Sequence, residues 1–179
     1  MPNLKLYVII SSVNSKIIYT PLTNKIIKNL TAGDKVEING TLYIARDQAH
    51  KRLAELIKNG KKLPFPFEGQ ILYYCGPTPE RKGEVIGSAG PTTSKRMDPF
   101  TSILLEHGIK GTIGKGTRSK EVTDAIKKYN AIYFVTYGGA GAYLRQFIVK
   151  NELIAYPELG PEAIRKITVK NFPAYVETI

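Results

Sequence analysis

Two arginines, a lysine and a run of hydroxyl residues carry the groups with which this sequence could do chemistry. Arg46, the stretch from Thr92 to Arg96, and Lys115 each fall after an expected strand and just before an expected helix. In a parallel α/β sheet such loops gather along one edge, where helix N-termini add free N–H groups and partial positive charge. Two guanidiniums, an ammonium and several hydroxyls there suit a small dianion. The alternative is that these cations merely occupy exposed loop tips.

A glycine- and hydroxyl-rich segment, GSAGPTTS at 87–94, leads into the second of these loops. Glycines let the backbone approach a ligand closely, and the four hydroxyl groups of the segment can donate hydrogen bonds to oxyanions. The segment therefore favours anion binding, although a turn that is simply rich in hydroxyls would have the same composition.

Other ligand-binding patterns fail on spacing. Gly114-Lys115 is followed by Gly116, where a nucleotide-binding P-loop needs Ser or Thr. The segment GGAGA at 138–142 follows an expected strand but misses the dinucleotide fingerprint, so tight backbone packing is the favoured interpretation. A surface that faces a partner subunit is the alternative for this segment.

The histidines and the cysteine do not form a metal site by themselves. His50 and His107 are the only histidines, and neither has a Cys or a second His at ligand spacing. His50 lies four residues after Arg46, so it either orients that arginine or lines a helix surface. Cys75 is the only cysteine, so this chain cannot supply the several thiolates of an iron–sulfur cluster. Any such cluster would have to be held by a partner.

The composition predicts a single domain over 1–179 with a basic surface. Hydrophobic residues make up 42% of the 179 residues, and 26 Lys and Arg against 15 Asp and Glu give a net charge of +11. The cations are scattered, so a solvated surface is the simplest interpretation, with acidic partners or substrates as alternatives. No apolar run approaches the roughly 18 residues of a membrane span, and no export signal is recognised. We therefore expect a soluble, cytoplasmic protein.

Periodicity and turn residues predict an α/β fold. Helices are expected to begin with the capping residues Thr23, Asp47, Asp98 and Ser119. Asn39-Gly40 is a hairpin signal between two expected strands. Because strands and helices alternate in the second half, we expect a largely parallel sheet there, before a tail of short strands with a turn of helix near 161–164. Strands are expected at 4–13, 15–20, 35–38, 41–45, 70–75, 84–86, 111–113 and 131–136.

Several segments resemble, in family order from about residue 20 to the end, the β region of class I iron–sulfur fumarate hydratases and L-tartrate dehydratases. The longest of them, GSAGPTTSKRMD at 87–98, is highly specific, whereas GKG alone would mean little. The other matching segments are TPL at 20–22, GD at 33–34, ARDQAHKR at 45–52, YCGPTP at 74–79, GKG at 114–116, GG at 138–139 and FPA at 172–174.

The resemblance implies a three-layered swivelling β/β/α fold, with residues 1–19 as a variable N-terminal arm. It implies an α subunit that binds a [4Fe–4S] cluster through three cysteines, and reversible addition of water to fumarate to give (S)-malate. By matching motifs, Arg46, Arg96 and Lys115 correspond to cations that hold the substrate's carboxylates, and Thr92 to the base that moves the carbon-bound proton. The chain would be inactive without its α subunit. The expected assembly is a dimer of heterodimers or a homodimer of β subunits.

Three alternatives stay open at this point. L-Tartrate, which differs from malate by one hydroxyl, is the rival substrate. A basic nucleic-acid-binding module is a different class of function, but aromatic residues are not interleaved with the cations in any recognition motif. A stand-alone anion-binding or structural domain that has lost its catalytic partner is the third.

Overall fold

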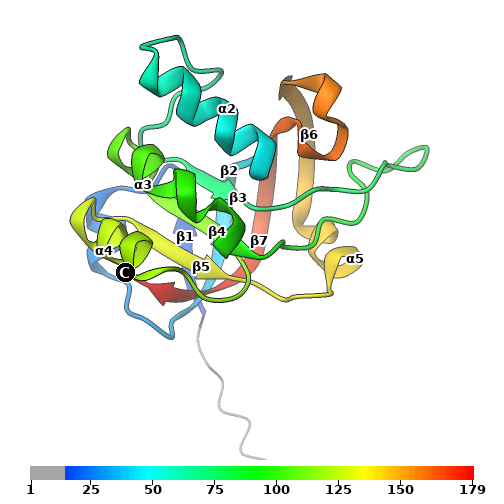
Figure 1. The fold of residues 1–179 in the computed structure, drawn as a ribbon. Coiled ribbons are helices and arrows are strands. Elements are labelled where there is room, and N and C mark those ends of the chain that lie inside the picture. Colours follow the sequence, from blue (N-terminus) through cyan, green and yellow to red (C-terminus); the bar gives the residue numbers. More distant parts are fainter. Residues whose placement is uncertain (1–14) are drawn as a thin grey trace, which may run out of the picture.

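The computed structural model describes residues 15–179, which form a mixed α/β fold (Figure 1). Short 3₁₀ helices lie at Ser94–Met97, Arg145–Phe147 and Pro157–Glu162. The α-helices are α1 (Asn24–Lys28), α2 (Asp47–Lys58), α3 (Asp98–Glu106), α4 (Lys120–Lys128) and α5 (Gly141–Leu144). The strands are β1 (Lys16–Tyr19), β2 (Lys35–Ile44), β3 (Ile71–Tyr73), β4 (Gly111–Gly114), β5 (Ile132–Val135), β6 (Ile148–Ala155) and β7 (Ile164–Thr178).

The sheet has the strand order β1-β2-β3-β4-β5-β7-β6, and its first five strands pair in parallel. The long strand β7 pairs antiparallel with β5 and β6, and also with β2 along most of its length. Because β7 joins β5 back to β2, the sheet closes on itself. Because the first five strands run parallel, they present their carboxyl ends along one rim, and α/β sheets bind ligands outside the carboxyl ends of their strands.

Two apolar clusters hold the layers together. One lies between the parallel strands and helices α2, α3 and α4, which run side by side in Figure 1, and includes Leu53, Leu104 and Ile126. The other fills the space enclosed by β2, β3, β5 and β7, and includes Ile38 and Phe172. Burial on both faces explains why the short parallel strands consist almost wholly of buried residues.

The predicted α/β class and the parallel sheet are confirmed, with one difference of extent. Parallel pairing already begins at β1 and β2, so it is not confined to the second half of the chain. The tail is antiparallel, since both of its strands, β6 and β7, run against their neighbours. Within residues 15–179, no helix has the length and apolar character needed to cross a membrane. The strand expected at 4–13 lies outside the described residues.

The hairpin predicted at Asn39-Gly40 is wrong, because these residues lie inside the single strand β2. Gly40 has φ +112°, and the register with β7 shifts between Ile38 and Gly40, as at a β-bulge. A Cβ at Gly40 would meet the Thr20 hydroxyl at 2.5 Å, so glycine is required here for close approach as well as for backbone angle. An Asn-Gly signal favours a hairpin only when the two flanking strands pair with each other, and here both flanks pair with β7.

The strand predicted at 84–86 is also wrong, since this segment is an irregular loop. Its carbonyl groups bond to side chains instead of a neighbouring strand. The Val85 carbonyl accepts from Asn151 Nδ2 at 3.1 Å, and the Ile86 carbonyl accepts from Arg145 Nη1 at 3.3 Å. Backbone groups satisfied in this way need no strand partner.

The predicted helix caps hold in two cases and shift by one residue in two others. Thr23 and Ser119 accept hydrogen bonds from Ile26 N and Val122 N, as N-cap side chains do. Asp47 and Asp98, in contrast, are the first helical residues, preceded by Arg46 and Met97. Their carboxylates bind arginines, so each carries a tertiary contact in place of the local cap.

Candidate functional site

Thr92 and Lys115 are adjacent at the carboxyl ends of β3 and β4. The Thr92 amide donates to the Tyr74 carbonyl at 2.7 Å, and the Lys115 amide donates to the Thr92 carbonyl at 3.2 Å. Ser94 N then donates to the Lys115 carbonyl at 2.9 Å, so residues 92–94 extend the parallel pattern beyond the strand ends. This ladder holds the Thr92 backbone between the two neighbouring strands.

Arg46 and Arg96 meet at Asp47, on the same rim. Arg96 Nε donates to Asp47 Oδ1 at 2.7 Å, and Arg46 Nη2 lies 3.5 Å from Asp47 Oδ2. Glu162 Oε1 is 3.8 Å from the same Arg46 nitrogen. The Arg46 side chain crosses Gly76, where an added Cβ would lie 2.5 Å from Nη1. The long loop after β3 therefore makes room for this guanidinium by having glycine at that point.

Among the described residues, Lys115 differs from the two arginines of the group in its lack of a carboxylate partner. It is exposed, and among residues 15–179 it forms no ion pair. A Cβ at Gly138, just beyond β5, would lie 3.5 Å from its Cδ. Among these five groups, the three cations Arg46, Arg96 and Lys115 exceed the two carboxylates Asp47 and Glu162 by one positive charge.

The structure thus brings all four residues singled out from the sequence to the carboxyl rim of the parallel strands. Arg46 follows β2, Thr92 and Arg96 follow β3, and Lys115 follows β4. Their placement supports a binding site for an anion, because cations and free hydroxyls converge where strand ends and helix starts meet. Their roles in binding and catalysis stay predictions.

Asp47, Glu162 and Gly76 belong to the same rim but received no site role from the sequence. Asp47 was predicted only as a helix cap, and Glu162 comes from the tail, 116 positions after Arg46. Glu162 Oε2 also accepts from Gln48 N at 2.8 Å, which ties the 3₁₀ helix Pro157–Glu162 to the start of α2. The only sequence signal for Asp47 as a site residue is its position directly after Arg46, and Glu162 has no such signal.

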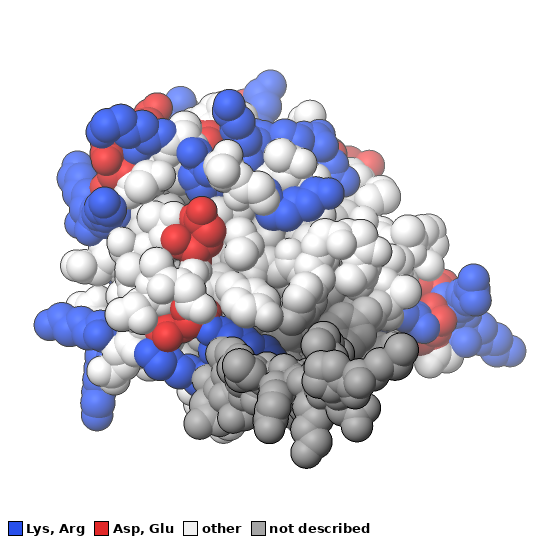
Figure 2. All heavy atoms as spheres, turned by 90° about the horizontal axis from the view of Figure 1, so that it is seen from below, with Lys and Arg blue, Asp and Glu red and all other residues white. Residues whose placement is uncertain are grey.

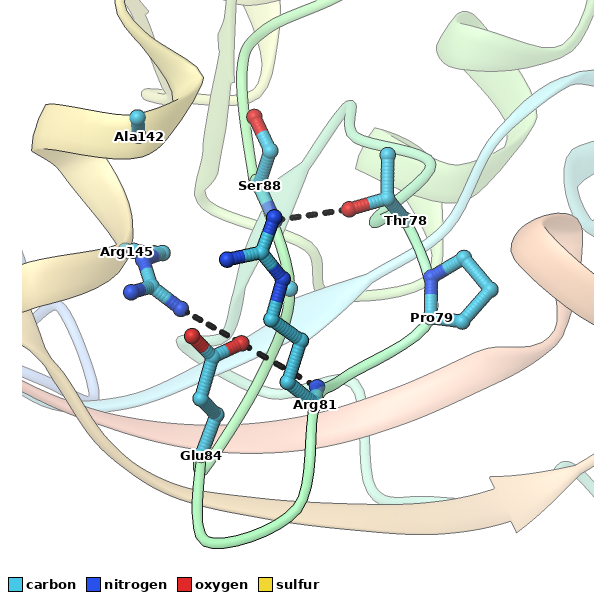
Figure 3. Close-up of a pocket in the computed structure, with 8 residues that line it drawn as sticks. Thr78, Pro79, Arg81, Glu84, Ser88, Ala142 and Arg145 are labelled. Atoms are coloured by element: carbon cyan, nitrogen blue, oxygen red, sulfur yellow. Dashed lines mark hydrogen bonds and ion pairs between the residues drawn. The ribbon is translucent and has the colours of Figure 1, made fainter.

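A separate pocket of about 230 Å³ opens between the 78–88 loop and α5 (Figure 3). In Figure 3 Arg145 and Arg81 flank Glu84, with the Arg145 guanidinium 2.8 Å from the Glu84 carboxylate. Arg81 N donates to the same carboxylate at 3.1 Å. Because its acidic group is already paired and none of Arg46, Thr92, Arg96 or Lys115 lines it, we place the candidate site at the rim and not in this pocket.

The surface charge is dispersed on the face shown in Figure 2. Lys and Arg lie in separate groups around its edge, with Asp and Glu among them, and a broad area without charge occupies the middle. Outside the grey atoms this face offers no continuous basic stripe of the kind that tracks a nucleic-acid backbone.

His50 is buried and touches the backbone of Arg46, which corrects the alternative of a histidine on the helix surface. Its Nδ1 lies 2.8 Å from the Arg46 carbonyl oxygen, and its ring packs edge-on against Tyr74. Burial lowers the pKa of His50 to about 4, so the ring is neutral at pH 7 and Nδ1–H donates to that carbonyl. His50 therefore supports the start of α2, where Arg46 emerges.

Acid is expected to destabilise the fold through His50. The pKa of His50 is lower in the folded protein than in the unfolded chain, so the unfolded chain binds the proton more tightly. The contribution of His50 to the free energy of unfolding is therefore complete above about pH 6.5, falls as the pH drops toward 4 and is lost below it. The shift corresponds to about 3 kcal/mol in the free energy of unfolding. Urea unfolding at several pH values gives the free energy of unfolding as a function of pH. Between about pH 4 and 6.5 this free energy should rise less steeply with pH in His50→Gln than in the wild type. His107→Gln, at an exposed histidine, is the control, and equal slopes in all three proteins would contradict the assignment.

The glycine segment 138–142 packs closely on the loop that carries Thr92, as its sequence predicted. Ala89 N donates to the Gly141 carbonyl at 3.1 Å, and a Cβ at Gly90 would lie 3.3 Å from Gly141 Cα. A Cβ at Gly141 would come within 2.8 Å of the Gly90 amide nitrogen, which is backbone and cannot swing away. This contact fixes the 87–92 segment against α5.

Gly141→Ala is expected to lower the free energy of unfolding by about 1 to 3 kcal/mol, because the added methyl overpacks a backbone contact. The urea midpoint measures this loss. Gly138→Ala is the matched control, since its methyl would only reach Lys115 Cδ at 3.5 Å, an ordinary contact distance. If Gly141→Ala were as stable as this control, the segment 87–92 and the start of α5 would not be in tight backbone contact.

Arg118 is a structural cation that the sequence did not indicate. Its side chain is 1% exposed, donates to Asp98 Oδ1 at 2.7 Å and to Thr101 Oγ1 at 2.7 Å, and lies over Tyr74 and Tyr133. The Asp98 carboxylate also accepts from Ser119 N at 2.8 Å. Arg118 therefore joins the starts of α3 and α4 behind the rim, and its charge is already paired.

Comparison with known proteins places this arrangement among fumarase-related sequences. The family model described as "Fumarase C-terminus" matches residues 10–178. The chain is 43% identical to "Fumarate hydratase 2" of Leishmania major and 44% identical to "Fumarate hydratase class I, anaerobic" of Escherichia coli, over 80% and 79% of its own length. It spans only 26% of each of these two relatives. It is also 35% identical to the "Putative L(+)-tartrate dehydratase subunit beta" of Methanocaldococcus jannaschii, over 86% of this chain and 82% of that protein.

Proposed function

Because this chain belongs to the fumarase C-terminal family, we propose that it is the β subunit of a heteromeric hydro-lyase that reversibly hydrates fumarate to (S)-malate. The observation that carries this proposal is the meeting of Arg46 and Arg96 at Asp47, on the rim where Thr92 and Lys115 adjoin. A dicarboxylate needs cations at two ends, and this rim provides three.

In this proposal the three cations hold the substrate's carboxylates. With Arg96 Nε occupied by Asp47, the two terminal nitrogens of that guanidinium have no partner among residues 15–179 and can grip one carboxylate bidentately. Lys115 acts as a point charge toward the developing negative charge when the carbon acid loses its proton. The Arg46 side chain is more buried than that of Arg96, so its guanidinium is held more rigidly as a hydrogen-bond donor.

Thr92 is proposed as the group that removes the carbon-bound proton of malate. Its hydroxyl has no hydrogen-bond partner among residues 15–179, so it is available to a ligand. Threonine is a poor base in water, and the role therefore requires an electropositive site that stabilises the alkoxide form. Lys115, whose amide donates to the Thr92 carbonyl, is the cation placed next to it in the backbone ladder.

A [4Fe–4S] cluster, which membership in this family implies, does not fit the residues of this chain. Burial raises the pKa of Cys75, the only cysteine, to about 12, so its thiol stays protonated and enclosed. Residues 15–179 contain no group of three His, Cys, Asp or Glu side chains able to hold a metal ion. We therefore assign the cluster to an α subunit and derive no step of this chain's chemistry from it.

The finer features of the assembly are part of the same proposal. The closed β arrangement and the one-sided helix layer are compatible with a swivelling β/β/α domain that turns its rim toward the α subunit. A β homodimer or a dimer of heterodimers, and a cytoplasmic location, remain predictions.

Co-expression with a cysteine-bearing α subunit, followed by anaerobic reconstitution with iron and sulfide, tests the function. The absorbance of fumarate should fall when fumarate is added to the complex, and it should rise when (S)-malate is added instead. This chain alone should produce neither change. L-Tartrate is the second substrate to test, because the chain covers most of a relative named for that activity. A loaded complex that converts neither substrate would refute the proposal.

A further inference from the structure

Asp47 contacts both guanidiniums of the proposed site. Its Oδ1 accepts from Arg96 Nε at 2.7 Å, while its Oδ2 lies 3.5 Å from Arg46 Nη2 and has no hydrogen bond among residues 15–179. As the first residue of α2, it sits where the helix dipole favours a negative charge. One carboxylate thus joins a cation from the end of β2 to a cation 50 positions later in the chain.

We propose that Asp47 is a positioning residue that orients Arg46 and Arg96 toward the substrate. The inference rests on the proposed function, because it assigns a role in holding the dicarboxylate for reaction. It concerns a residue that touches the two cations and not the substrate itself.

The geometry of the Arg96 guanidinium explains why its Nε is the nitrogen to restrain. A guanidinium offers two edges to a carboxylate, one formed by Nε and a terminal nitrogen and one by the two terminal nitrogens. Asp47 binds at Nε, which leaves the edge formed by the two terminal nitrogens without a hydrogen bond or ion pair among residues 15–179. The Arg96 side chain is 51% exposed, so without this bond it would sample many rotamers before each binding event.

Glu162 does not duplicate this role. It approaches only Arg46, at 3.8 Å, and its other oxygen is bound to Gln48 N. Asp47 is therefore the only carboxylate among residues 15–179 that forms an ion pair with Arg96.

The competing interpretation is that Asp47 is a counter-ion that the substrate must displace. The two roles predict opposite kinetics. A positioning carboxylate makes the bound geometry reactive, so its loss lowers kcat and raises KM, since misplacement by about 1 Å can cost about 10²-fold. A competing carboxylate weakens binding only, so its loss would lower KM and leave kcat unchanged.

The test is Asp47→Asn in the reconstituted complex, which keeps the shape and removes the charge. We expect kcat to fall about 10- to 100-fold and KM for fumarate to rise, with Asp47→Glu recovering part of the loss. Asp124→Asn is the matched control, because Asp124 is an exposed partner of Lys120 on α4. A lower KM with unchanged kcat would overturn the proposal.

A second measurement does not depend on turnover. In the wild-type chain the Arg96 Nε–H should exchange slowly with solvent, as observed by ¹⁵N NMR. Asp47→Ala, which removes the acceptor oxygen, should abolish this protection, while Asp124→Ala keeps it. Unchanged protection in Asp47→Ala would overturn the positioning role. If the complex converts neither fumarate nor tartrate but the protection is lost, the proposed function fails while the restraint on Arg96 stands.

Discussion

Thr92→Ala is expected to lower kcat for fumarate hydration and malate dehydration by about 10² to 10⁴-fold, the range typical of losing a general base. KM should change little, because the carboxylate-binding cations remain. The substitution removes only a half-buried hydroxyl and a methyl, so the complex should still assemble. Steady-state kinetics of the reconstituted complex, with sedimentation to confirm assembly, would measure both effects.

The neighbouring residue provides the control for this experiment. Thr93 is exposed and is the next residue of the same extended segment, where successive side chains point to opposite sides, so Thr93→Ala removes the same chemical group from the other side of the segment. Exchange of the malate carbon-bound proton with deuterium isolates the step assigned to Thr92, and Thr92→Ser should retain part of it. Equal rates in Thr92→Ala and Thr93→Ala would remove Thr92 from the mechanism.

Arg46→Ala is expected to reduce kcat/KM for fumarate by about 10² to 10³-fold. Two charge-assisted hydrogen bonds to one carboxylate are worth about 3 to 4 kcal/mol together, and each 1.36 kcal/mol is tenfold in rate. Arg46→Lys should recover little of this, because an ammonium cannot reproduce the planar fork. The measurement is kcat/KM for the reconstituted complex at a fixed, low salt concentration.

Arg52→Ala is the control on the same helix. Arg52 pairs with Glu158 and lies over the Tyr156 ring, away from Asp47, so its loss removes a cation from α2 without altering the rim. A comparable fall in kcat/KM for Arg52→Ala would mean that the general charge of α2, and not the Arg46 guanidinium, attracts the substrate. An unchanged kcat/KM in Arg46→Ala would exclude Arg46 from substrate binding.

Local features of the fold could be read from the sequence because their causes are local. Thr23 and Ser119 cap their helices through atoms only three residues away. The apolar spacing in α4 buries Val122, Ala125 and Ile126 as its period predicts. The errors fall where a distant partner decided, as at Asn39-Gly40, where pairing with β7 turned an expected hairpin into a bulge.

In the candidate site, too, some features could be predicted from the sequence and others depended on distant partners. The order of strands and helices was enough to place Arg46, Thr92, Arg96 and Lys115 at one rim, because parallel strands must end on the same side. The links among them, however, join residues 49 positions apart, as in Arg96–Asp47, and 114 apart, as in Gln48–Glu162. The spacing of residues along the chain carries no signal for such pairs.

The sequence by itself determined the α/β class, the family and the four residues proposed for the site, since these depend on short periodicities and on motifs such as the one at 87–98. Only the tertiary structure decided that β7 closes the sheet, that Gly76 makes room for Arg46 and that Asp47 joins two arginines. Packing and ion pairing depend on distances in space, and residues far apart in the chain come within reach only when the whole sheet has formed.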